Sequence, residues 1–201
     1  MSKAVMLSIR PKWVEKIVNG EKTIEVRKTR PKLQTPFKCY IYCTMDHPYI
    51  SVSCGELDKL NYRTNTVGRC NGKVIGEFTC DRIYELETKS HGGSYYVKGE
   101  GQSTTNEVAR QSCLTLKDMH KYLKAAKGHG WHISNLKIYD APKKLGEFWR
   151  DCLEYSELST NCWSCENICG DGDETDCNTD GRLYLRRPPQ SWCYVEAMKD
   201  E

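Results

Sequence analysis

The sequence predicts an α+β fold, a small β-barrel that carries two or three helices on its rim. Three observations lead to this prediction. Short apolar runs of strand length recur along the chain, separated by stretches that contain Pro, Gly and Asn. Helical periodicity is sustained in only two segments. With 201 residues and 38% hydrophobic content, the chain is long enough for one sizeable core and short for two.

The N-terminal segment predicts a strand followed by a helix. Residues 4–9 form a short apolar run bounded by polar residues, which is typical of a buried strand. Pro11 suits the first turn of a helix, and Asn19-Gly20 suits its left-handed exit. The apolar residues between them recur at helical spacing on one face, and they are Trp13, Val14, Ile17 and Val18.

A second strand is expected over residues 23–28, where polar and apolar residues alternate. Side chains on a strand point alternately to its two faces, so Thr23, Glu25 and Arg27 share one face. A carboxylate and a guanidinium therefore point in the same direction.

Five further elements follow from the same patterns. The strand expected over 72–84 alternates and directs Glu77 inward as a second acid. The helix expected over 115–126 has Thr115 as its N-cap and Asp118 at the capping-box position. The remaining strands are expected at 38–44, 128–139 and 187–195.

A single domain spanning residues 1–201 is expected to hold three insertions, at about 45–71, 87–111 and 151–181. The first is a long polar connection that contains Asn and Gly. The second is rich in Gly, Ser, Thr and Lys without sustained periodicity, so we expect a flexible excursion. The third is rich in cysteine and in acidic residues.

Charge is distributed unevenly along the chain. Residues 1–32 hold nine basic side chains and three acidic ones, whereas residues 151–181 hold nine acidic side chains and no lysine or arginine. The acidic stretch is typical of a solvated loop. The basic side chains are interleaved with predicted structure, which favours a nucleotide or nucleic-acid partner on that surface.

The composition also indicates where the protein works. No apolar run approaches the roughly 20 residues that span a bilayer, and no signal peptide is evident. We therefore expect a soluble, cytoplasmic protein that has no membrane partner. In that setting most of the twelve cysteines are expected to be buried thiols, among them Cys39, Cys43 and Cys80.

Four segments carry a family resemblance, and they occur in the order LSIRPKWVEKIVNGEKTIEVRKTRP, GKVIGEFTCDRI, GWHISNLKIYDAPKKLGEF and RPPQSWCYV. Together they resemble the ASCH domain family, part of the PUA-like superfamily of small β-barrels, and the GEKTIEVRK block is their most specific part. The resemblance implies a PUA-like pseudo-barrel with a cleft lined by the block from Gly20 to Arg27. It also implies that this cleft binds RNA or a modified nucleoside.

The residues themselves fit such a cleft. Lysine and arginine beside a strand edge suit a phosphate or a polarised carbonyl, and a carboxylate can accept from the exocyclic amine of a base. Trp192 could stack on a base or belong to the core. The expected ligand-binding residues are Ser8, Arg10, Lys12, Lys22, Thr23, Glu25, Arg27, Lys28, Arg30 and Trp192.

A hydrolase is the alternative function. Some bacterial members of the family resemble amidohydrolases that remove acetyl from N4-acetylcytidine with a lysine, a nearby threonine and a later glutamate. Lys22 matches the lysine, Glu25 stands where the threonine is expected, and Glu77 corresponds loosely to the glutamate. As an enzyme the protein would use Lys22 with Glu25 or Glu77 as acid and base, on an acylated nucleoside or as a ribonuclease. Binding is preferred because the threonine is missing.

The third insertion contains a possible structural zinc site. Its spacing, CxxC followed by two further thiols, suits tetrahedral thiolate ligation, with Cys152 as a substitute ligand. Unligated thiols, disulfides or a redox CxxC are the alternatives. The predicted ligands are Cys162, Cys165, Cys169 and Cys177.

Other cofactors are not expected. The five histidines are scattered without the spacing of a catalytic metal site, and no Walker or dinucleotide glycine pattern occurs, so no nucleotide cofactor is predicted. A third function remains open, in which the protein is an adaptor that docks a protein partner through the zinc-bound loop.

Overall fold

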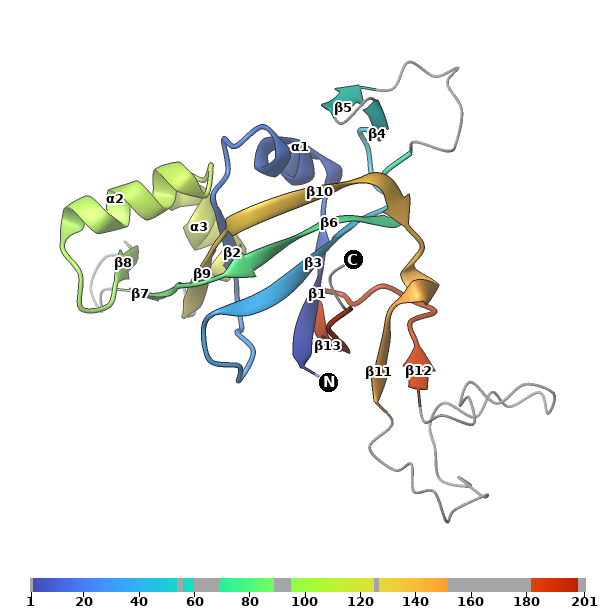
Figure 1. Cartoon of the computed structure of the whole chain (residues 1–201). Helices are drawn as coiled ribbons and strands as arrows, with labels where there is room; N and C mark the ends of the chain where they lie inside the picture. The colour runs from blue at the N-terminus through green and yellow to red at the C-terminus, as the bar shows by residue number, and fades with distance from the viewer. Residues whose placement is uncertain are drawn as a thin grey trace, which may run out of the picture.

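The computed structural model describes residues 2–53, 56–59, 69–88, 95–124, 127–151 and 182–198. Its larger sheet has five strands in the order β10-β6-β3-β1-β13 (Figure 1). β1 and β3 are parallel, and the other neighbours are antiparallel. The bounds of the strands are β1 Lys3–Ile9, β3 Phe37–Cys43, β6 Lys73–Cys80, β10 Ser134–Lys143 and β13 Trp192–Glu196.

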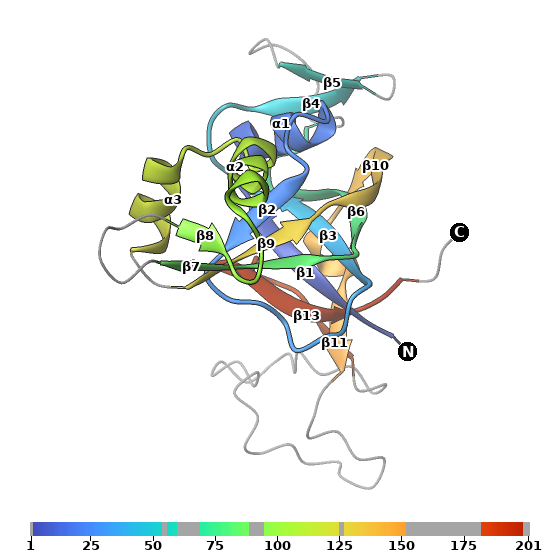
Figure 2. The ribbon, with the colours of Figure 1, turned by 90° about the vertical axis from the view of Figure 1, so that its left-hand side faces the viewer.

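The second sheet has four antiparallel strands in the order β2-β9-β7-β8. Two separate two-stranded ribbons, β4–β5 and β11–β12, extend beyond the sheets (Figures 1 and 2). The bounds are β2 Ile24–Arg27, β7 Ile83–Thr88, β8 Tyr95–Val97, β9 Gly128–His132, β4 Ile50–Ser53, β5 Glu56–Lys59, β11 Trp149–Asp151 and β12 Arg182–Tyr184.

Within the described residues, three α-helices and one short 3-10 helix accompany the sheets. Their bounds are α1 Pro11–Val18, α2 Gln102–Gln111, α3 Leu116–Leu123 and η2 Leu145–Glu147. α1 starts with Pro11 and is followed by Gly20, whose φ of +72° is one that glycine adopts without strain. α3 begins with a capping box in which Thr115 and Asp118 bond each other's backbone amides.

Three apolar clusters organise these elements into layers. The first joins one face of the five-stranded sheet to Trp131 of β9 and to the buried residues of α1. The second covers the outer face of the five-stranded sheet and includes Tyr40 and Phe148. The third lies on the outer face of the four-stranded sheet and includes Ile24 of β2, Val108 of α2 and Met119 of α3. Figure 2 shows the two helices beside this sheet.

The α+β class is confirmed, since the described residues form sheets accompanied by three α-helices. The described strands pair as two sheets and two ribbons, so their hydrogen bonding closes no barrel. One local expectation was wrong. Residues 102–111, expected to be irregular, form α2, which only Thr105 and Val108 anchor by burial.

Two further sequence predictions can be compared with the structure. Cys39, Cys43 and Cys80 are buried free thiols, as predicted. Burial raises the pKa of Cys80 to about 12, so this thiol stays protonated at neutral pH. Among the residues described, no helix has the length and apolar character needed to cross a membrane.

Candidate functional site

Three charged side chains from one short segment are almost completely buried between the sheets. Their exposed fractions are 3% for Lys22, 7% for Glu25 and 6% for Arg27. The Lys22 ammonium lies 3.2 Å from Oε2 of Glu25, and Nε of Arg27 lies 3.0 Å from Oε1 of the same carboxylate. Nε of Arg27 makes no hydrogen bond there, because its N–H is not aligned with an acceptor. We call these residues the ion cluster.

Lys22 connects the ion cluster to α2. Its ammonium donates to the backbone oxygen of Ile24 at 2.9 Å and to that of Ser112 at 2.8 Å. Ser112 caps the C-terminus of α2, where unpaired carbonyls favour a cation. The lysine therefore has three oxygen partners in the described structure.

Arg27 connects the ion cluster to the edge of the five-stranded sheet. Its Nη2 donates to the backbone oxygen of Ser8 at 2.8 Å, and Nη1 lies 3.3 Å from both the backbone oxygen and the hydroxyl of Ser191. Ser8 and Ser191 lie where β1 and β13 separate, one step beyond the paired residues Leu7 and Trp192. The guanidinium therefore joins β2 to the end of this ladder.

The ion cluster carries an excess of positive charge. Two cations share one carboxylate, and the remaining partners of both cations are neutral oxygens. Burying charges costs free energy unless they are paired and hydrogen-bonded, and here Glu25 pairs with both cations. The uncompensated positive charge favours an anionic or electron-rich ligand nearby.

Aromatic side chains surround the ion cluster. The Lys22 ammonium lies 5.2 Å from the ring centroid of Trp13, and the Lys12 ammonium lies 4.6 Å from the same ring. Tyr122 of α3 is 40% exposed, and the ammonium of Lys28 lies 5.5 Å from its ring. Burial raises the pKa of Tyr122, and the nearby charge of Arg27 lowers it. The Tyr122 ring therefore lies beside Lys28, the residue that follows Arg27, and still contacts solvent.

Trp131 adds an unpaired donor on the same face. It lies opposite Glu25 in the β2–β9 ladder, and paired residues of a ladder project to the same side. Its indole is fully buried, and its Nε1 has no hydrogen-bond partner in the described structure. Its ring packs on Phe37 and Trp192, with centroids 5.8 and 6.0 Å away. A buried N–H without an acceptor costs free energy that a ligand or a water could recover.

The other predicted binding residues lie at varying distances from the ion cluster. Ser8 contributes its backbone oxygen, while its hydroxyl donates to the backbone oxygen of Pro189 at 2.6 Å. Thr23 extends the segment through backbone bonds to Gln111 and Ile133. Trp192 is partly buried and donates from Nε1 to the hydroxyl of Thr29 at 3.0 Å.

The predicted basic residues form an exposed margin around this segment. Lys12 and Lys28 lie over Trp13 and Tyr122, as described above. Arg10 lies 3.5 Å from the carboxylate of Asp46, and Arg30 lies 3.9 Å from that of Glu85. Exposed ion pairs of this kind contribute little to stability, so both guanidinium groups can exchange partners readily.

Glu77 is not part of this group. It lies opposite Tyr40 in the β3–β6 ladder, and Tyr40 belongs to the cluster on the outer face of the five-stranded sheet. Its carboxylate accepts from the Tyr139 hydroxyl at 2.6 Å and lies 3.2 Å from the Lys38 ammonium. The structure therefore places Lys22 and Glu77 on different faces of that sheet.

The predicted zinc ligands Cys162, Cys165, Cys169 and Cys177, together with Cys152, lie outside the described residues. Within the described ranges, no group of three or more His, Cys, Asp or Glu side chains could hold a metal ion. The zinc site therefore stays a prediction.

Sequence patterns missed several members of the site. Helical spacing predicts both Trp13 and Tyr122 on the apolar faces of their helices, yet Trp13 is partly exposed and Tyr122 is exposed, each beside a lysine. The carbonyl of Ser112 is 90 residues from Lys22 in the chain, so no local pattern could connect them. The positive excess of residues 1–32 was the signal that indicated the region.

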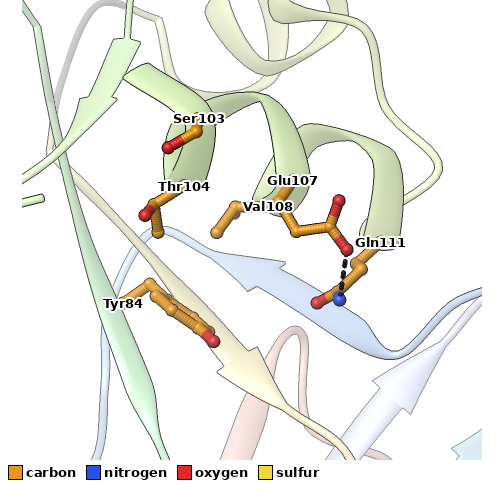
Figure 3. A pocket seen from close by; sticks show the side chains of 6 residues that line it. All are labelled: Tyr84, Ser103, Thr104, Glu107, Val108 and Gln111. Atoms are coloured by element: carbon orange, nitrogen blue, oxygen red, sulfur yellow. Dashed lines mark hydrogen bonds between the residues drawn. The ribbon is translucent and has the colours of Figure 1, made fainter. Parts of the chain in front are cut away.

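A shallow hollow lies between α2 and β7 (Figure 3). Gln111 donates there to Glu107 at 2.7 Å, which occupies one carboxylate oxygen. None of the predicted site residues lines it. The lining residues are Tyr84, Ser103, Thr104, Glu107, Val108 and Gln111.

Comparisons with known proteins agree with the sequence resemblance. Residues 7–88 match the family model of the ASCH domain. The crystal structure of ASCH from Zymomonas mobilis is similar in fold, with a TM-score of 0.51 and 14% identity over 96% of this chain and 87% of that one. A point mutant of that protein gives a TM-score of 0.50 and 14% identity over 96% and 88% of the two chains. At this identity the likeness concerns the fold alone. No curated protein matches the chain in sequence.

Proposed function

Because residues 7–88 match the family model of the ASCH domain, we propose that the chain binds RNA or a modified nucleoside beside the ion cluster of Lys22, Glu25 and Arg27. The observation that carries this proposal is a buried site with excess positive charge whose aromatic margin still contacts solvent. A nucleotide offers the complementary groups, namely an anionic phosphate and a base with a π-face.

Each part of the site has a defined role in this proposal. Trp13 and Tyr122 offer faces on which a base can stack. Lys12 and Lys28 beside these rings attract phosphate. A carboxylate has about four lone-pair positions, so Glu25 retains capacity to accept from the exocyclic amine of a base.

The same geometry supports binding over hydrolysis. Hydrolysis by Lys22 and Glu77 would need both side chains at one reacting atom, but they lie on different faces of the five-stranded sheet. Glu25 is near Lys22, but its two oxygens each face a cation and Lys22 already donates to two backbone carbonyls. Proton transfer to or from either group would first have to break these contacts.

Binding can be measured with fluorescently labelled RNA octamers of randomised sequence and with the four nucleoside monophosphates, at low salt where the electrostatic contribution is largest. We expect the octamers to bind and Trp13→Ala to lower their affinity about tenfold, since stacking on an aromatic side chain contributes about 1–3 kcal/mol per base. Trp149→Ala is the matched control, because Trp149 is also partly buried but lies on β11, at the other end of the sheet from α1 (Figure 1).

Two outcomes would contradict the proposal. The first is absence of octamer and mononucleotide binding by the wild-type protein. The second is an equal loss in the Trp13 and Trp149 variants, which would assign the effect to folding. Release of acetate from N4-acetylcytidine, lost in Lys22→Met, would instead favour the hydrolase.

We also propose that Cys162, Cys165, Cys169 and Cys177 bind a structural zinc ion, as their spacing suggests. Elemental analysis of the purified protein should find about one zinc ion per chain. The double variant Cys162→Ser with Cys165→Ser should lack it, while Cys193→Ser, a change outside the insertion, should retain it. If elemental analysis finds no metal in the purified wild-type protein, the zinc prediction is wrong.

A further inference from the structure

We propose that the loop after β3, together with Arg69, forms a second subsite that stacks the nucleotide next to the one at the ion cluster. The subsite consists of His47, Tyr49 and Arg69, and we call it the loop platform. This inference rests on the proposed function and sharpens it. The ligand would be a strand of RNA and not a free nucleoside.

The loop starts beside the N-terminus of α1. β1 and β3 run in parallel, and their last paired residues are Ile9 and Cys43. The amide of Thr44 donates to the backbone oxygen of Ile9 at 2.9 Å, and Arg10 reaches Asp46 at 3.5 Å. Figures 1 and 2 both show β4, which follows the loop, near α1 at the same end of the sheet.

A buried asparagine holds this exposed loop in one conformation. Asn71 is only 4% exposed. Its Nδ2 donates to the backbone oxygens of Asp46 at 2.7 Å and Pro48 at 3.2 Å, and its Oδ1 accepts from the amide of Ile50 at 2.9 Å. These bonds hold the loop that carries His47 and Tyr49, which reduces the entropic cost of binding at these two rings.

The platform has the groups that bind single-stranded RNA. The rings of His47 and Tyr49 lie with centroids 4.4 Å apart, and the guanidinium carbon of Arg69 lies 4.0 Å from the centroid of Tyr49. His47 is exposed, and the other two are partly exposed. Nε of Arg69 is covered yet has no hydrogen-bond partner in the described structure. Stacked aromatic and guanidinium planes are typical of surfaces that hold unpaired bases.

Basic side chains at the start of α1 lie between the ion cluster and the loop that carries the platform. The ammonium groups of Lys22 and Lys12 both lie over the ring of Trp13. Arg10 precedes α1 and pairs with Asp46 in the loop. Lys22, Lys12 and Arg10 thus lie on the side of α1 that links the two positions, where they can contact a phosphate backbone.

The test compares a strand with single nucleotides. Tyr49→Ala should lower the affinity for randomised RNA octamers about tenfold while leaving the affinity for nucleoside monophosphates unchanged. Tyr49→Phe keeps the ring and should bind like the wild type. Arg69→Gln should reduce the slope of log affinity against log salt by about 0.7, the value for one phosphate contact on a single strand.

The ribbon of β11 and β12 provides matched controls. There Tyr184 packs on Trp149 with centroids 6.0 Å apart, and Arg182 lies 5.0 Å from the same Trp149 ring, at the other end of the molecule from α1 (Figure 1). Tyr184→Ala and Arg182→Gln should leave octamer affinity unchanged. An equal loss in these variants would overturn the inference.

The remaining outcomes separate the two proposals. If Trp13→Ala weakens both ligands while Tyr49→Ala and Arg69→Gln bind octamers like the wild type, the loop platform is wrong and the proposed function stands. If the wild-type protein binds neither ligand, the proposed function fails and the inference fails with it. Circular dichroism and the melting temperature of each variant would show that its fold is intact.

Discussion

Glu25 and Glu77 are both strand carboxylates close to cations, yet their surroundings differ. Glu25 lies between the sheets and faces two cations that are themselves buried. Glu77 lies on the outer face of the five-stranded sheet, where its cation, Lys38, has a side chain that is 25% exposed. Strand alternation alone therefore does not determine which acid points into the protein, because that depends on which face of the strand packs against the second sheet.

The energetic consequences follow from the number and burial of the partners. Loss of the charge of Glu25 would leave Lys22 and Arg27 buried without a counter-charge, which is the costly case for buried ions. Loss of the charge of Glu77 would leave Lys38 able to reach water. Substitutions that change one of these two carboxylates or its cation at a time test this difference.

The largest effect is expected for Glu25→Gln, which removes the charge and keeps the shape. It should lower the free energy of unfolding by about 3–5 kcal/mol, the typical cost of breaking a buried ion pair. Glu77→Gln should cost about 1 kcal/mol, because an amide still accepts from Tyr139. Urea unfolding of both variants measures the difference, and equal costs would mean that the two sites are not distinct.

A smaller effect is expected when the lysines are compared. Lys22→Met keeps the length of the side chain but leaves the carbonyls of Ile24 and Ser112 without this donor, at a cost of about 2–3 kcal/mol. Lys38→Met should cost less than about 1 kcal/mol, since its ion pair is partly exposed. The same unfolding measurement applies, and a cost for Lys38→Met that matches Lys22→Met would contradict the assignment.

The smallest effect is expected from a change of pH that protonates His129, which lies beside the ion cluster. His129 lies opposite Arg27 in the β2–β9 ladder, and burial, followed by the charge of Arg30, lowers its pKa below the usual 6.5. The unfolded chain therefore binds this proton more readily than the folded one does, so stability should fall as pH drops below about 6.5.

The variant His129→Gln tests this dependence. It should flatten the pH profile of the melting temperature between about 6.5 and the lower pKa of the folded state. Glu77→Gln is the control, because Glu77 lies on the outer face of the five-stranded sheet, and it should leave that part of the profile unchanged. A profile that His129→Gln leaves unaltered would exclude the histidine as the source of the acid sensitivity.

Local patterns predicted much of the fold because the information lies within a few residues. Pro11 and Gly20 bound α1, and Thr115 with Asp118 starts α3, as expected from their spacing. α2 escaped prediction because it is a polar helix with little apolar face. Contacts with β8 hold it, including the hydroxyl of Thr105, which accepts from the amide of Val97 at 3.1 Å.

Only the part of the site that depends on strand alternation was predictable from the sequence. Alternation placed Glu25 and Arg27 on one face, and the structure has both buried on the side of Trp131. Alternation also directed Glu77 inward, but which side of a strand faces the second sheet depends on long-range packing. The burial of Lys22 likewise depends on Ser112, which folding brings from far along the chain.

The bond between Lys22 and the carbonyl of Ser112 has a consequence for how such chains diversify. A relative without residues 102–111 would keep the lysine just before β2 but lose the helix whose end presents the Ser112 carbonyl to it. A lysine released in this way could reach a substrate, as acid–base or nucleophilic chemistry requires. An amine-reactive reagent should then label Lys22 faster in a variant that lacks residues 102–111 than in the wild-type protein.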